Sequence, residues 1–418
     1  MTERRALVIG GSLGGLVVAQ LLRSTGWDAA VFERNDEELA SRGVGLGTHP
    51  QLIAILRRAG VAFDETMGIT PPRGVCLDRR GKIIIEQPMA RMLSSWSRLY
   101  RALLAALPRQ DYRLGKKLTR IAQHTDRVTA IFADGTSERG DLLVGADGIR
   151  STVRAQFLPD LQPAYAGYVA WRAVLDEADV PPELWREMVE LYAFCLPEGE
   201  QSISYAVPGR DNDIAVGRRA YNIVWYRPTD LDALTDICTD ANGRYHAGGI
   251  PPPLIRRDVI ERVKADASAV LAPQIADIFA RTAPFFQPIY DLISPRLVFG
   301  RVALAGDAAF VARPHAGAGT TKAALDAACL ADSIRDAGDD LGSGLAHYER
   351  MQLPFGQALV ELNRQEGAYL SAQLKRKADR SAAELHRNTG AVLHAHIARS
   401  EQVGDLVAAH GLSALAGT

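Results

Sequence analysis

Hydrophobic residues near the N-terminus follow two different periods. The apolar run at 6–9 and the mostly apolar segment at 27–32, which contains Asp28, each predict a buried strand. Between them, the apolar residues at 17, 18, 21 and 22 keep the spacing of one helix face. Strand, helix and strand in this order predict a βαβ unit with parallel strands, and therefore an α/β fold.

The turn after the first predicted strand is rich in glycine. Residues 10–15 read GGSLGG, and Glu33 ends the second strand. A glycine turn that opens a helix, followed by an acid after the next strand, is the dinucleotide-binding fingerprint. Ser12 replaces the second glycine of the fingerprint, but serine is small and its hydroxyl is able to donate to a phosphate. A glycine turn that binds nothing is the alternative, and the neighbouring strand, helix and Glu33 make it the weaker interpretation.

A similar arrangement recurs late in the chain. The apolar run at 302–304 predicts a short strand, and Asp307 follows it. A loop with three small residues at 317–319 comes next, and an alanine-rich helix begins after Thr320. The start of a helix offers unpaired N–H groups and a partial positive charge. Together with the acid, these groups indicate a site for a ligand that carries hydroxyls and negative charge.

Three further regions of the chain are distinguished by the secondary structure that their sequence patterns predict. A strand at 142–145 ends at Asp147, and a helix starts after it. Residues 164–285 are rich in predicted strands that carry aromatic side chains, which suits either a lid over a flat substrate or an ordinary sheet core. From 353 to 415 the pattern is mostly helical.

Composition excludes several classes of function. The net charge of −1 gives no reason to expect nucleic acid or an anionic membrane as a partner. No apolar stretch is long enough for a secretory signal or a membrane span. The 4 cysteines are scattered without CxxC spacing, which predicts reduced thiols in a cytoplasm, no disulfide framework and no metal site.

With these motifs identified, the chain resembles the class A flavoprotein monooxygenases, the aromatic hydroxylases similar to para-hydroxybenzoate hydroxylase. The matching segments are 10–15 with Glu33-Arg34, 145–151, and 306–309 with Pro314, Gly317 and Gly319. Within this family, the segments AYAGYVAWRAVL, NIVWYRP and ARPHAGAG look most like the 2,6-dihydroxypyridine 3-hydroxylase branch.

The resemblance implies a particular organisation of the α/β fold. A Rossmann-like FAD-binding domain would carry an inserted β-sheet substrate domain and a helical C-terminal segment. The predicted FAD-binding domain comprises 1–75, 98–163 and 286–352, the substrate-binding domain comprises 76–97 and 164–285, and the helical C-terminal segment comprises 353–418.

FAD is the resident cofactor that the resemblance implies. By analogy, the turn at 10–15 holds the pyrophosphate, Glu33 holds the adenosine ribose and Asp307 meets the ribityl or pyrophosphate part. The loop at 314–321 would follow the isoalloxazine ring, where a helix N-terminus stabilises the negative charge of reduced flavin. The expected cofactor-binding residues are Gly10, Ser12, Leu13, Gly14, Gly15, Glu33, Arg34, Gly47, Leu118, Asp147, Gly306, Asp307, Pro314, Gly317, Ala318, Gly319 and Thr320.

The sequence departs from the family pattern at four positions. Phe310 replaces the usual histidine after GDAA, Ala318 replaces a glutamine and Thr321 replaces an asparagine. Trp96 stands where an arginine usually reaches the flavin from a helix. Stacking by Trp96 would then take the place of that arginine.

Three side chains are candidates for handling the substrate. His315 lies in the predicted flavin loop, where it is a candidate base or hydrogen-bond partner for a phenolate-like ring; a loop histidine that faces water is the alternative. His49 precedes a predicted helix, and a structural role there is the alternative. Tyr226 ends a strand of the predicted lid.

The resemblance implies a monooxygenase reaction. NAD(P)H would reduce FAD, O2 would form a C4a-hydroperoxyflavin, and an electron-rich ring carbon would take its distal oxygen. The partners are then a small hydroxylated aromatic or N-heteroaromatic substrate and O2, with a homodimer as a family-level expectation. The alternatives are a halogenase or reductase on the same fold, or a flavin-binding regulator without turnover.

Overall fold

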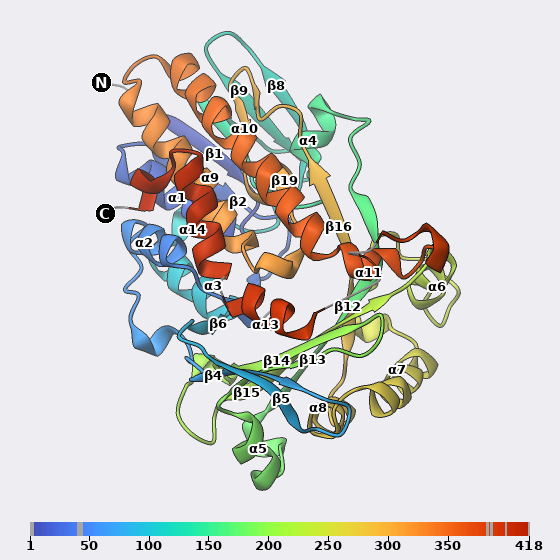
Figure 1. The fold of residues 1–418 in the computed structure, drawn as a ribbon. Helices are drawn as coiled ribbons and strands as arrows, with labels where there is room; N and C mark the ends of the chain where they lie inside the picture. The colour runs from blue at the N-terminus through green and yellow to red at the C-terminus, as the bar shows by residue number, and fades with distance from the viewer. Residues whose placement is uncertain (1–3, 40–44, 382–383, 385–387, 398, 417–418) are drawn as a thin grey trace.

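Two β-sheets of different construction meet in this protein (Figure 1). The structure is a computed structural model that describes residues 4–39, 45–381, 384, 388–397 and 399–416. Among these residues, no helix is both long and apolar enough to cross a membrane.

The first sheet is six-stranded and mainly parallel. Its order is β17 (Val298–Phe299), β18 (Val302–Leu304), β11 (Leu142–Gly145), β1 (Arg5–Ile9), β2 (Asp28–Phe32) and β7 (Tyr112–Arg113). Strands β18, β11, β1, β2 and β7 run parallel, so their carboxyl ends meet at one edge of the sheet. Ligands of open α/β sheets bind at such an edge.

Helices and a small sheet cover this parallel sheet. Helices α1 (Leu13–Ser24) and α9 (Gly319–Asp336) pack against each other in the same core. An antiparallel sheet of β8 (Leu118–Gln123), β9 (Val128–Phe132) and β10 (Ser137–Gly140) joins the same core, where Phe132 stacks on Phe32 at 5.0 Å between ring centroids. Helix α4 (Thr152–Phe157) contacts β8.

The second sheet is eight-stranded and mostly antiparallel. Its order is β19 (Phe310–Val311), β16 (Phe285–Ile293), β12 (Ala164–Asp176), β15 (Ala220–Pro228), β14 (Gln201–Val207), β13 (Leu191–Cys195), β4 (Arg73–Leu77) and β5 (Ile83–Pro88). Strand β19 begins three residues after Asp307, so the sheet begins beside the end of the parallel sheet. The predicted boundary at 285/286 coincides with the start of β16, and the division into domains stays a prediction.

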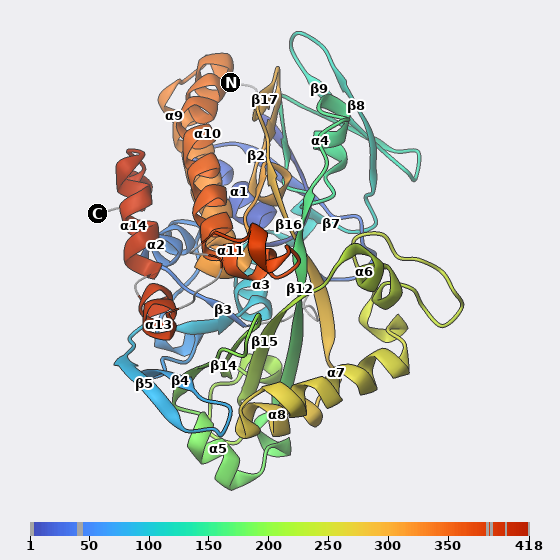
Figure 2. The same ribbon diagram turned by 45° about the vertical axis from the view of Figure 1, so that its right-hand side comes forward.

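Strand periodicity gives this second sheet two different faces. One face carries Val169, Trp171 and Trp225 and packs in a core with α5 (Pro182–Met188), α7 (Arg257–Val270) and α8 (Pro273–Ala280). Helix α6 (Leu231–Ile237) precedes α7 at the same end of the molecule (Figure 2). The other face, which we call the inner face, carries Tyr168, Tyr192, Tyr205 and Tyr226 in a separate cluster. Alternate residues of a strand point to opposite sides, so the aromatic residues of one strand divide between the two faces.

Short elements lie between the two sheets. Strands β3 (Gly45–Gly47) and β6 (Leu93–Ser95) form a two-stranded sheet. Helix α2 (Pro50–Arg58) follows β3 and contacts α9, and helix α3 (Trp96–Ala105) follows β6 and contacts α1.

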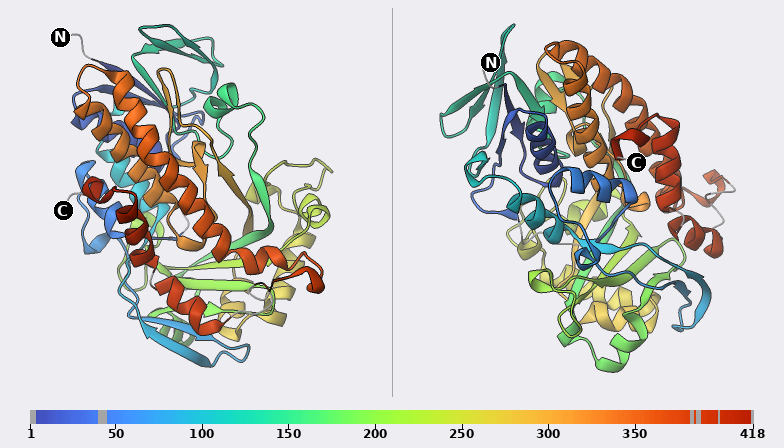
Figure 3. Two further views of the ribbon diagram at one scale, coloured as in Figure 1. Left: turned by 45° about the horizontal axis from the view of Figure 1, so that its top comes forward. Right: turned by 90° about the vertical axis from the view of Figure 1, so that its left-hand side faces the viewer.

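The C-terminal helices lie along both parts of the molecule (Figure 3). Helix α10 (Leu341–Glu366) packs on α9 and continues through Pro354, so the predicted segment boundary at 353 falls inside a helix. Helices α11 (Ala368–Ala372) and α13 (Thr389–Ile397) contact the second sheet, and α14 (Arg399–Ala409) returns to α10. The predicted helical character of this region is therefore confirmed.

Candidate flavin and substrate site

The glycine turn after β1 is closed by contacts that only glycine permits. Gly10 has a φ of +109°, and a Cβ there would lie 2.4 Å from the Ala146 carbonyl oxygen. A Cβ at Gly15 would lie 1.9 Å from the Gly10 carbonyl oxygen. The Gly11 N–H donates to the buried Glu33 carboxylate at 2.8 Å. This hydrogen bond joins the turn to Glu33, the acid of the dinucleotide-binding fingerprint.

The predicted nucleotide-binding residues surround a single cavity. Its volume is about 200 Å³. Sequence reasoning missed Lys116, Lys117 and Thr152, which also line it, because nothing in their local pattern distinguishes them. The predicted residues among its lining are Gly10, Ser12, Glu33, Arg34, Leu118 and Asp147. A small cavity with glycine backbone, an acid and lysines fits the nucleotide part of FAD.

Asp147 holds the start of helix α4. Its carboxylate accepts hydrogen bonds from the N–H groups of Thr152 at 2.7 Å and Val153 at 3.2 Å, and from the Ser151 hydroxyl. Burial raises the pKa of the Asp147 carboxyl, while these hydrogen bonds act to lower it. Arg154 of the same helix donates to the Ala308 carbonyl at 3.0 Å, which ties this motif to the segment around Asp307.

A buried ion pair supports the backbone next to Asp307. The Asp326 carboxylate accepts from the Gly306 N–H at 2.8 Å, and Lys322 Nζ donates to the Gly306 carbonyl at 2.6 Å. Lys322 and Asp326 lie 3.2 Å apart, and both are buried. Lys322 was not predicted, because a lysine in an alanine-rich helix usually faces water. Its pairing with Asp326 fixes the position of Gly306.

The Asp307 side chain remains exposed although protein surrounds it on most sides. No described residue donates a hydrogen bond to its carboxylate. Burial among these atoms raises the pKa of Asp307, and the Lys322 charge acts to lower it. An acid that faces open space inside the molecule suits a hydroxyl-bearing ligand such as the ribityl chain.

The loop before α9 presents open backbone. Gly317 has a φ of +62°, and a Cβ at Gly317 or Gly319 would meet no atom within 4 Å. Asn363 of α10 holds the loop from behind, since its Oδ1 accepts the Ala316 N–H at 2.8 Å. Pro314, Ala318 and Thr320 lie in this same segment. The loop therefore has room for a flat ring beside the N-terminus of α9, as FAD binding requires.

His315 turns away from water, toward the second sheet. Its side chain is 1% exposed, so the alternative of a solvent-facing loop histidine is wrong. His315 Nε2 lies 2.6 Å from the Tyr168 hydroxyl, and its ring centroid lies 5.0 Å from that of Tyr226. Burial raises the pKa of Tyr168, against the nearby Arg313 charge. The fold thus brings the two predicted residues His315 and Tyr226 together and adds Tyr168.

Gly367 packs behind this pair. A Cβ at Gly367 would lie 2.6 Å from the Tyr168 hydroxyl and 2.8 Å from His315 Nε2. Neither Tyr168 nor Gly367 was predicted, because the contact joins three segments that are distant in the sequence. The C-terminal helices therefore form one wall of the site.

His49 has a different position. It precedes α2, is fully buried, and its Nδ1 lies 2.8 Å from the Thr321 hydroxyl of α9. Thr321 is one of the departures from the family pattern. His49 therefore contacts the helix that follows the open loop, while His315 contacts the sheet.

Side-chain packing explains two other departures from the family sequence pattern, Phe310 and Trp96. Phe310 is buried, and a Cβ at Gly356 of α10 would lie 2.2 Å from its ring, so a glycine and a phenylalanine fit together there. Trp96 stacks on Tyr100 of its own helix with 4.9 Å between ring centroids. Across the residues that the structure describes, no cluster of side chains is suited to hold a metal ion.

Comparison with known proteins agrees with this geometry. The sequence model of a family described as FAD binding domain-like matches residues 165–291. The chain is 31% identical over 363 residues to 2,6-dihydroxypyridine 3-monooxygenase of Paenarthrobacter nicotinovorans, covering 86% of this chain and 89% of that protein. It is 28% identical over 402 residues to 3-amino-4-hydroxybenzoate 2-monooxygenase of Streptomyces cremeus, covering 92% and 89%.

Solved structures give the same result. The structure of 2,6-dihydroxypyridine-3-hydroxylase from Arthrobacter nicotinovorans matches with a TM-score of 0.83 and 28% identity, covering 92% of this chain and 97% of that one. Klebsiella pneumoniae HpxO complexed with FAD and uric acid shares the fold, with a TM-score of 0.70, 23% identity and coverage of 99% and 96%. The predicted fold class, cofactor and resemblance are confirmed, and this chain belongs to the FAD-dependent aromatic monooxygenases.

Proposed function

We propose that this monooxygenase hydroxylates a small, electron-rich hydroxylated ring, with 2,6-dihydroxypyridine as the first candidate and NAD(P)H as the reductant. The observation that carries the proposal is the position of His315. This residue belongs to the loop that has room for a flat ring, and it contacts Tyr168 and Tyr226 on the inner face of the second sheet. A ring held between the loop and the sheet would meet all three side chains.

The chain's own residues would divide the work in this way. The turn at 10–15, Glu33 and Asp307 would bind FAD, which when bound supplies the activated oxygen for the reaction. His315 would accept or hold the proton of a ring hydroxyl, with Tyr168 as its neighbour. Tyr226 would orient the ring, and His49 would position the start of α9 through Thr321. The buried inner face would exclude water from the reacting atoms.

The first test follows NAD(P)H oxidation by the purified flavoprotein with and without 2,6-dihydroxypyridine, and determines the product mass by chromatography. Faster oxidation with a product heavier by one oxygen supports the proposal. Faster oxidation that yields only hydrogen peroxide identifies an effector and contradicts this substrate. No stimulation by any phenol or hydroxylated heteroaromatic would favour a flavin-binding regulator instead.

A pair of variants tests the role of His315. His315→Asn and Tyr168→Phe are each expected to lower turnover and to change its pH profile, while the bound flavin stays at the wild-type level. Tyr165→Phe is the matched control, because Tyr165 lies on the same strand and its hydroxyl donates to the Thr229 carbonyl instead. Unchanged turnover in His315→Asn would remove His315 from the reaction.

Two further expectations belong to this proposal. We place the reaction in the cytoplasm, in keeping with 4 cysteines that are all buried and are scattered without CxxC spacing. We also propose a homodimer, which light scattering during size-exclusion chromatography would test.

A further inference from the structure

Several hydrogen-bond donors gather on the inner face of the second sheet, next to strand β3. Arg91 lies over the Tyr192 ring, with 5.8 Å from its Cζ to the ring centroid. A Cβ at Gly47 would lie 3.1 Å from the same Cζ. Two positions earlier on β3, a Cβ at Gly45 would lie 2.7 Å from the Tyr205 ring and 3.1 Å from Asn222 Cγ. Arg91, Asn222 and Tyr205 therefore border one short strand.

These donors have fewer acceptors than they need. Arg91 Nε and Nη1 are buried and have no hydrogen-bond partner among the described residues. The third nitrogen, Nη2, makes only a long contact of 3.4 Å with the Tyr192 hydroxyl. Asn222 is fully buried, and its Nδ2 also lacks a partner within the described part of the chain. Buried donors of this kind are normally paired, and an unpaired one destabilises the fold.

Arg172 adds a second positive charge to the same face. It pairs in register with Val224 of β15, and Val224 pairs with Ile203 of β14, so the three side chains point to one side of the sheet. Its Nε donates to the neutral Gln287 at 2.7 Å. Neither Arg91 nor Arg172 forms an ion pair with any acid that the structure describes. Both arginines act to lower the pKa of Tyr205, although burial raises it overall.

We propose that Arg91, with Asn222 and Arg172 beside it, binds a negative charge on the ring substrate: a ring carboxylate or an ionised ring hydroxyl. The inference rests on the proposed function and narrows it to an anionic hydroxylated ring. A guanidinium stays charged at every physiological pH and presents a planar set of donors that fits a carboxylate. An anion would supply the acceptors that the described residues do not offer to Arg91 Nε and Nη1. His315 at the other side of the face would then meet the part of the ring that reacts.

The test measures ligand affinity from the absorption change of the bound flavin. The holoproteins are wild type, Arg91→Met, Arg91→Lys and the control Arg256→Met, whose arginine lies on the far side of the second sheet. The first ligands are 6-hydroxynicotinate and its neutral amide, 6-hydroxynicotinamide. Wild type should prefer the carboxylate, Arg91→Met should bind it roughly 30-fold more weakly, and Arg91→Lys should keep part of the preference. Arg256→Met should bind like wild type.

A second arm covers an ionised hydroxyl. If the charge lies on the ring hydroxyl, the affinity of wild type for 2,6-dihydroxypyridine should rise as the ligand ionises, and Arg91→Met should lose that rise. Either result supports the proposal. Affinities that depend on neither the carboxylate nor the ionisation of the ligand would overturn the proposal for Arg91. The proposed function would still hold if the substrate stimulated NAD(P)H oxidation and the product gained one oxygen.

Three measurements that need no turnover distinguish a role of Arg91 in ligand binding from a role in flavin binding or in the fold. The dissociation constant of FAD and the reduction potential of bound flavin should match wild type in Arg91→Met. A change in either, with unchanged ligand discrimination, would assign Arg91 to the flavin and contradict the proposal. The thermal midpoint of ligand-free Arg91→Met should equal or exceed that of wild type, because an unpaired buried charge is removed. A large fall would mean that Arg91 is structural.

Discussion

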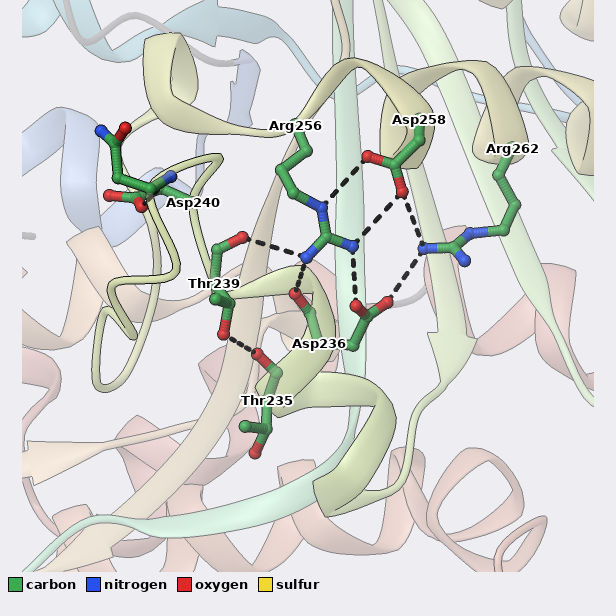
Figure 4. Close-up of polar contacts among 8 residues, drawn as sticks. Thr235, Asp236, Thr239, Asp240, Arg256, Asp258 and Arg262 are labelled. Atoms are coloured by element: carbon green, nitrogen blue, oxygen red, sulfur yellow. Dashed lines mark hydrogen bonds and ion pairs between the residues drawn. The ribbon is translucent and has the colours of Figure 1, made fainter.

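Two arginine-containing regions of the second sheet and its helices differ in what surrounds the charge. In the first, between α6 and α7, Arg256 donates to Asp236 at 2.6 Å and to Asp258 at 3.1 Å, and Arg262 reaches Asp236 at 3.0 Å (Figure 4). In the second, on the inner face, Arg91 contacts a tyrosine ring and has buried nitrogens without acceptors in the described structure.

This difference in charge pairing indicates that the two regions have different roles. The Arg256 cluster is complete by itself, since every charge has an opposite charge beside it, and it joins two helices at the surface. Arg91 has no such acid among the described residues, and we propose that a bound anion supplies the negative charge. A fold tolerates an uncompensated buried donor when a ligand compensates it, so such groups point to binding sites.

The largest expected effect comes from giving Arg91 an acid within the protein. Tyr192→Glu and Tyr192→Gln both lose a buried ring, and Tyr192→Gln should destabilise the protein by about 3 kcal/mol. Tyr192→Glu should retain about 1.5 kcal/mol more stability than Tyr192→Gln, because its carboxylate pairs with Arg91. It should also bind anionic rings more weakly than Tyr192→Gln. Urea unfolding and flavin absorption titrations would measure both, and equal stabilities would argue that Arg91 is not short of an acceptor.

Asp307 is a third case in the comparison of paired and unpaired charges, an acidic side chain that faces open space. Asp307→Asn should raise the dissociation constant of FAD about 10-fold, as expected when a charged hydrogen-bond partner is lost. The FAD-free variant should be at least as stable as wild type at neutral pH, because burial raises the pKa of Asp307 and so disfavours its ionised form in the folded protein. Fluorescence titration would measure the dissociation constant of FAD, and thermal unfolding would measure the stability of the FAD-free variant. A less stable FAD-free variant would show that Asp307 serves the fold.

Asp236 tests the complete cluster. Asp236→Asn should lower the free energy of unfolding by about 0.5 to 1 kcal/mol, since the cluster is largely exposed and solvent screens it. Ligand discrimination should stay as in wild type. Asp160→Asn, at an exposed position, is the control for loss of one negative charge. A change in ligand affinity in Asp236→Asn would remove the distinction between the two regions.

The smallest effect concerns acid pH. Hydrogen bonds from Arg256 lower the pKa of Asp236 and of Asp258 from the ordinary value of 3.8. Acids with a lowered folded-state pKa stabilise the fold above their unfolded pKa and lose that contribution as the pH falls through the folded value. Between pH 5 and pH 2, about the range over which paired carboxylates become protonated, wild type should therefore lose more of its thermal stability than Asp236→Asn. If the thermal stability of wild type and of Asp236→Asn fell equally over this pH range, solvent would screen the ion pairs of Asp236 completely.

Local pattern was sufficient for the flavin part of the molecule. The turn at 10–15, Glu33, Asp147 and Asp307 each lie within three residues of the end of a strand, and parallel strands bring their carboxyl ends to one edge. Four segments that are far apart in the chain were therefore assigned to one edge of the sheet from the sequence. Lys322 escaped the same reasoning, since its partner Asp326 lies one turn away but its burial depends on the helices packed around α9.

The substrate side required the tertiary structure. His315 and Tyr168 are separated by 147 positions, and Gly367 reaches them from a third segment. Whether the described residues offer acceptors to Arg91 depends on the segments folded around it, and no single stretch of sequence contains that information. Thus the sequence determined the fold through its periods, glycines and strand ends, and it indicated the family and the cofactor through the resemblance of its motifs. Only the tertiary structure decided which side chains line the proposed substrate site, because long-range packing selects the partner of each buried polar group.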